Sequence, residues 1–147
     1  MWRVVGLAGL LGAVGFAVIE GAGRALGVRT AMTPSLWLDG AAFALAGMGL
    51  AALYVQAWSR GGWARRVGAA LAYVALFPFV TALLGGLAEL TFLGGWGYGG
   101  FVREALLAGP INLLATFTLE LGVVALPLGV VSVTLLLIAA RSPRQTA

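Results

Sequence analysis

The chain has 147 residues, of which 61% are hydrophobic and 10% charged, and its formal net charge is +4. A soluble domain carries about 25% charged residues, so this composition is typical of a membrane protein. The sequence contains no His, Cys or Lys. This excludes disulfides, thiolate catalysis, iron–sulfur clusters, ordinary zinc sites and Schiff-base chemistry, so we expect neither a cofactor nor a metal.

Four apolar segments are each long enough to cross a hydrocarbon layer about 30 Å thick. They are residues 2–25, 37–58, 67–93 and 112–140. The first is too long for a secretory signal, so we expect a retained anchor. Thr33 and Pro34 are typical of a helix cap and first turn, and Gly61 with Gly62 is typical of a helix end. The sequence predicts a single all-α domain, an integral membrane bundle of four transmembrane helices.

The arginines predict how this bundle is oriented. One side holds six of them: Arg3, Arg60, Arg65, Arg66, Arg141 and Arg144. The other side holds Arg24, Arg29 and Arg103. By the positive-inside rule both termini are cytoplasmic, as in a multi-pass protein of the bacterial inner membrane. The cytoplasmic arginines have no acidic partner in their own segments, so we expect them to meet anionic lipid head groups.

Aromatic residues mark the expected membrane boundaries. Trp58 and Trp63 fit the cytoplasmic boundary, while Trp37, Trp96 and Tyr98 fit the outer one. Residues 94–111 are predicted to form a short interfacial segment, with FVREALLA as an amphipathic helix on the outer surface. Its glycines do not make a phosphate-binding loop, because the required Lys is absent. We therefore expect no nucleotide or nucleic-acid partner.

Small residues recur every four positions in the first segment. They are Gly9, Ala13, Ala17, Gly21 and Ala25. Such stripes let helix backbones approach closely in lipid, so we expect this face to pack against other helices.

Three of the five acidic residues have an ordinary structural interpretation. Glu20 precedes Arg24 by four residues, the favourable order for a helical ion pair. Asp39 stands in the first turn of its segment, where the helix dipole stabilises a carboxylate. Glu104 follows Arg103 in the outer segment, where both are expected to be solvated.

Glu89 and Glu120 have no cation within one helical turn, which makes them candidates for function. Asn112 and Thr116 precede Glu120 at four-residue spacing and complete a polar stripe, so these four residues are the candidate ligand- or ion-binding set. If the two carboxylates share one outer cavity, one of them should retain its proton near neutral pH. The alternative is a structural match with Arg103 or Arg29.

Pro78 and Pro127 fall near the middle of the third and fourth segments. A proline there removes a backbone hydrogen bond and kinks the helix. The freed carbonyl could serve a substrate, although such kinks also help ordinary packing.

Three classes of function fit these observations. We favour a non-enzymatic accessory or assembly subunit of a larger membrane complex, because the chain is small and lacks a soluble domain. The alternative is a small oligomeric transporter or channel for a cation or small molecule, which would use the outer carboxylates. A lipid- or isoprenoid-modifying enzyme with paired carboxylates fits less well.

Overall fold

The computed structural model describes residues 1–28, 35–92, 94–97 and 99–141. Within these ranges all regular structure is helical. Four helices are long and apolar enough to cross a membrane: α1 (Trp2–Leu26), α2 (Leu36–Arg60), α3 (Trp63–Phe92) and α6 (Gly122–Arg141). These findings confirm the all-helical prediction. Five residues on which predictions rest lie outside the described ranges: Arg29, Thr33, Pro34, Tyr98 and Arg144.

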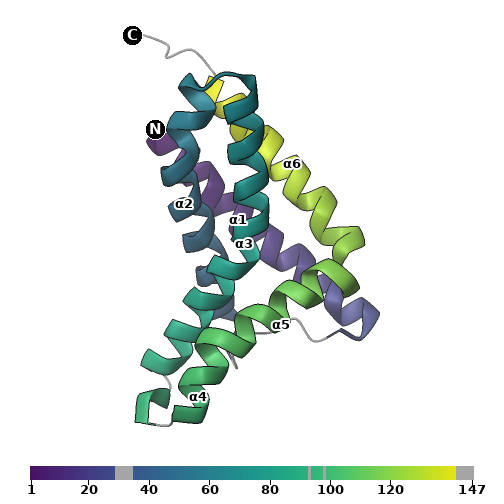
Figure 1. Ribbon diagram of the computed structural model, residues 1–147. Helices are drawn as coiled ribbons and strands as arrows, with labels where there is room; N and C mark the ends of the chain where they lie inside the picture. The colour runs from purple at the N-terminus through teal and green to yellow at the C-terminus, as the bar shows by residue number, and fades with distance from the viewer. Residues whose placement is uncertain (29–34, 93, 98, 142–147) are drawn as a thin grey trace.

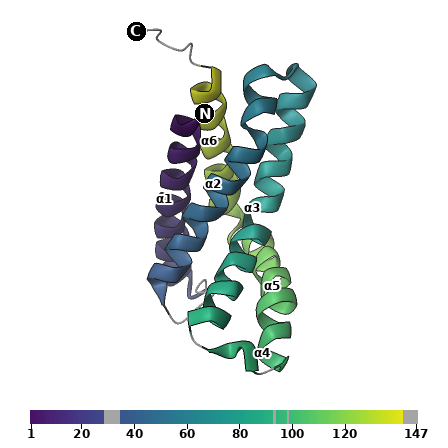
Figure 2. The same cartoon turned by 90° about the vertical axis from the view of Figure 1, so that its left-hand side faces the viewer.

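The long helices run up and down in chain order (Figures 1 and 2). The N-terminus, the turn between α2 and α3 and the end of α6 lie at one end of the molecule. Glycines end two helices: Gly27 follows α1 in the left-handed conformation, with φ 70°, and Gly61 caps α2 as predicted. In this arrangement α2 packs between α1 and α3, and α6 contacts all three.

The helices α1 and α2 approach each other closely. A Cβ atom added to Gly12 would lie 2.4 Å from the carbonyl oxygen of Phe43, and one added to Gly47 would lie 2.5 Å from that of Ala8. Real Cβ atoms are essentially never found so close to another atom, so only glycine fits at either position. Backbone therefore touches backbone at this crossing.

The predicted small-residue face of α1 is not the face that packs. Gly9 is buried, but Ala13, Ala17, Gly21 and Ala25 are exposed. The buried face instead includes Val4, Val5, Ala8, Gly12 and Ile19. Small residues occur on both faces of α1, and the contacting face fits α2 at Phe43 and Gly47, which the periodicity of one helix does not reveal.

The predicted fourth segment, residues 112–140, is not one continuous helix. Leu121, with φ −111° and ψ 9°, separates α6 from the helical residues before it. Those residues form α4 (Gly99–Arg103), η2 (Glu104–Ala108), α5 (Gly109–Ala115) and η3 (Thr116–Glu120), where η2 and η3 are π-helical turns. Most of the predicted interfacial segment, residues 94–111, is thus the start of a long helical arm that follows a short 3₁₀ turn, η1 (Gly95–Gly97).

This arm packs against the C-terminal half of α3 and forms a hairpin with it (Figure 1). The tip of the hairpin extends beyond the ends of α1 and α2 (Figure 2). α3 changes direction about halfway along, and Pro78 stands at the middle of its sequence, as expected for a proline kink. Pro127 lies inside α6, and the sharp turn of the chain comes earlier, at Leu121.

The buried side chains form two clusters. One surrounds Trp58 and Tyr73 at the end that holds the termini, and the other surrounds Phe43 near the middle. Trp58 is 0% exposed and its ring centroid lies 5.4 Å from that of Tyr73. The indole of Trp58 thus fills the core rather than facing outward, whereas Trp63 is exposed, and the assignment of both to the cytoplasmic boundary stays a prediction.

Candidate functional site

The ion pair expected on α1 is present. Nε of Arg24 lies 2.8 Å from Oε1 of Glu20 and donates a hydrogen bond to it. The two residues are one helical turn apart, so α1 alone brings them together. The Arg24 side chain is 66% exposed, which limits what the pair contributes to stability.

Asp39 is 0% exposed and stands in the first turn of α2. Its backbone N–H donates to the carbonyl of Ser35 at 3.3 Å, within this first turn. Stabilisation of its carboxylate by the helix dipole stays a prediction.

The structure does not bring Glu89 and Glu120 together. Glu89 is three residues from the end of α3, near the tip of the hairpin. Glu120 ends η3, 21 residues after Gly99, so it lies roughly 30 Å back along the other arm. The predicted shared site for both acids assumed that residues 94–111 connect two spans. In the structure most of these residues belong to the arm instead.

Neither carboxylate has an ion-pair partner among the described residues. Glu120 is exposed and Glu89 is half-buried. Asn112 is exposed and Thr116 is half-buried. The N–H of Leu121 donates to the carbonyl of Thr116 at 2.9 Å, a spacing of five residues, so the four-residue stripe does not continue regularly through η3.

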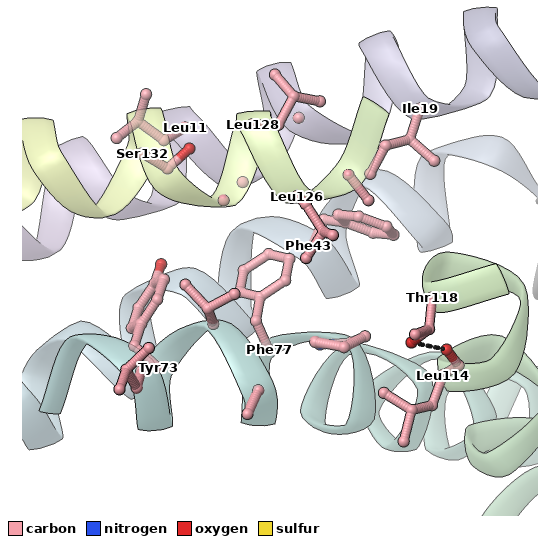
Figure 3. Close-up of a pocket in the computed structure, with 18 residues that line it drawn as sticks. Leu11, Ile19, Phe43, Tyr73, Phe77, Leu114, Thr118, Leu126, Leu128 and Ser132 are labelled. Atoms are coloured by element: carbon pink, nitrogen blue, oxygen red, sulfur yellow. Dashed lines mark hydrogen bonds between the residues drawn. The ribbon is translucent and has the colours of Figure 1, made fainter. Parts of the chain in front are cut away.

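A cavity of about 560 Å³ that could hold a ligand lies between α1, α3, η3 and α6 (Figure 3). It lies near the middle of α1 and α3, where Gly15 and Pro78 contribute to the wall. Leu71 and Leu126 also line it and are 66% and 57% exposed, so they mark an open side between α3 and α6. None of the described lining residues is charged.

An aromatic row forms one wall of this cavity. The ring centroids of Tyr73 and Phe77 are 5.9 Å apart, and those of Phe77 and Phe43 are 5.7 Å apart. Such tilted and edge-on contacts are the favoured geometry for aromatic pairs and stiffen the wall. Opposite this row, Gly129 of α6 faces Val74, with 3.3 Å between an added Cβ and Cγ1 of the valine.

The cavity is lined by three hydroxyl groups, which differ in their hydrogen bonding. Oγ1 of Thr118 donates to the carbonyl of Leu114 at 2.7 Å (Figure 3). Among the described residues, Tyr73 and Ser132 have no such bond. Tyr73 points from α3 toward α6, and Ser132 lies on α6 at the same end of the cavity (Figure 3). The Tyr73 hydroxyl also lies near α2, 3.5 Å from a Cβ added to Gly47.

The wall of the cavity is apolar apart from its hydroxyl groups, and the cavity is open on the side marked by Leu71 and Leu126. Water is a poor occupant, because apolar cavities stay dry. An apolar molecule is therefore the occupant that the wall chemistry favours.

Sequence reasoning missed this cavity, although two of its parts were visible. Pro78 was singled out as a possible site element, and Ser132 is a polar residue inside an apolar segment. No signal in the sequence indicated the break at Leu121, where α6 turns away from the preceding helical arm. No group of three or more His, Cys, Asp or Glu side chains that could hold a metal occurs among the described residues.

Comparison with known proteins does not add a function. No protein-family model matches the chain, and no curated protein or solved structure is detectably similar to it.

Proposed function

We propose that the chain is a multi-pass membrane protein that serves as a non-enzymatic subunit of a larger membrane assembly. The proposal places both termini in the cytoplasm, because six of the nine arginines flank that side. The exposed arginines Arg60 and Arg65, in the turn between α2 and α3, would there contact anionic lipid head groups.

The observation that carries the proposal is the uncovered face of α1. Ala13, Ala17, Gly21 and Ala25 are exposed although they follow the spacing of a helix-packing stripe. A Cβ added to Gly21 would meet no atom within 4 Å. A helix of another chain can approach this face closely, which supports an assembly role.

A small transporter or channel is the second candidate, and the cavity beside Pro78 is the observation that favours it. Two observations weaken the form of this candidate that transports a cation. Glu89 and Glu120 lie far apart, and none of the described residues that line the cavity is charged. The separation of Glu89 and Glu120 also weakens the proposal of an enzyme with paired carboxylates.

The test is the composition of the complex in mild detergent. The double variant Ala17→Leu with Gly21→Leu adds bulk to the exposed face, so the wild type should retain a stoichiometric partner that the variant loses. Ala52→Leu, at an exposed position of α2, is the matched control and should retain the partner. A wild-type homo-oligomer without other proteins favours the transporter candidate, and a monomer contradicts both.

The proposed orientation has its own test. A reporter fused after Ala147 should be cytoplasmic, and one inserted at Gly97 should be external. The opposite pattern overturns the assignment of the arginine-rich end to the cytoplasm.

A further inference from the structure

We propose that the cavity between α1, α3, η3 and α6 binds a membrane-soluble carbonyl compound with a hydrocarbon body. An acyl lipid and an isoprenoid quinone share this chemistry. The proposal rests on the shape and lining of the cavity and does not depend on the assembly role proposed above.

The apolar wall of the cavity favours a ligand with a hydrocarbon body. About 560 Å³ is within the range of sites that hold small organic ligands, and the wall is apolar apart from three hydroxyl groups. The cavity lies midway along α1 and α3, so in a membrane it would lie at the depth of the lipid chains. Its open side, between Leu71 and Leu126, would face those chains and admit a ligand from within the bilayer.

The hydroxyl groups of the cavity determine which polar group a ligand should carry. Thr118, the threonine that lines the cavity, donates to the carbonyl of Leu114, and Thr81, Thr91 and Thr134 of α3 and α6 likewise donate to the carbonyl four residues earlier, at 2.7–2.8 Å. Their hydrogens are therefore already used. Tyr73 and Ser132 make no such bond among the described residues and lie at one end of the cavity, so their hydroxyls can donate to a ligand carbonyl (Figure 3).

Gly15 offers a clean way to block the cavity. It lines the cavity, and a Cβ added to it would meet no atom within 4 Å, so Gly15→Leu fills the space without a clash at the backbone. Gly49→Leu is the matched control, because an added Cβ is equally free there and Gly49 does not line the cavity. Thermal unfolding of both variants checks that each is folded.

The experiment measures binding of two probes, oleic acid and a short-chain ubiquinone, to the purified protein by native mass spectrometry in mild detergent. Wild type and Gly49→Leu should bind one equivalent of at least one probe, and Gly15→Leu should bind at least tenfold more weakly. Binding of the fatty acid alone identifies an acyl ligand, and binding of the quinone alone identifies a quinone. Saturable binding of neither probe, or equal binding by Gly15→Leu, overturns the proposal.

Tyr73→Phe and Ser132→Ala test the polar contact, because they keep the shape and remove the donor. Each should weaken binding by about three- to tenfold, as expected for one hydrogen bond. A matched hydrocarbon without a carbonyl should bind wild type and both variants equally. If neither variant weakens carbonyl binding, the assignment of the two hydroxyls to a carbonyl is overturned.

Discussion

The contact between α1 and α2 and the contact between α3 and α6 are opposite solutions to helix packing. In the first pair Gly12 and Gly47 let two backbones touch, and α2 has ten buried residues. In the second, α6 has two buried residues, Val133 and Leu136, and a cavity opens beside the crossing. The difference indicates a rigid pair of helices on which a less tightly packed helix rests and leaves room for another molecule.

The largest expected effect is at the tight pair. Gly12→Leu or Gly47→Leu places a side chain where an added Cβ already lies within 2.5 Å of a carbonyl oxygen. Because backbone rather than a flexible side chain must move, we expect a loss of about 3 kcal/mol or more in the free energy of unfolding. Thermal unfolding in detergent measures it. Gly49→Leu should be nearly neutral, and an equal loss there would show that the α1–α2 crossing is not special.

A smaller effect is expected where α6 is anchored. Leu136 is 0% exposed, so Leu136→Ala should cost about 2–4 kcal/mol, while Leu126→Ala, at a position that is 57% exposed, should cost well under half of that. The unfolding midpoints of the two variants provide the comparison. Equal costs would mean that α6 packs evenly along its length, contrary to the structure.

The smallest effect is at the ion pair of Glu20 and Arg24. Either single change to Ala should destabilise α1, and the double change should cost less than the sum of the two. Because Arg24 is 66% exposed, the coupling should lie at about 0.2–0.5 kcal/mol. A double-mutant cycle at low salt measures it, and strict additivity would show that the pair contributes nothing.

Features set within one helix could be predicted from the sequence, and features set between helices could not. The pairing of Glu20 with Arg24 and the end of α2 at Gly61 follow from local spacing and turn chemistry. The break at Leu121 gave no such signal, because Leu is a good helix former and the apolar run continues through it. With that break missed, residues 112–140 became one span, and Glu89 and Glu120 were placed too close together.

The face by which α1 packs was missed for a related reason. Periodicity identified a stripe of small residues, but such a stripe can pack against a helix of the same chain or of another chain. The position of α2 shows that Gly12 meets the backbone of Phe43 and that Gly47 meets the backbone of Ala8. The core and the cavity depend on such pairwise fits, so they required coordinates.

The crossing of Gly12 and Gly47 also bears on the order in which the protein is made. α1 and α2 precede α3 and α6 in the chain, and their crossing is formed by Gly12 against Phe43 and Gly47 against Ala8. Close packing of small residues is a way in which helices associate within lipid. The helical hairpin of α1 and α2 can therefore close while the rest of the chain is still being synthesised. It would then be the template onto which α3, and after it α6, are packed.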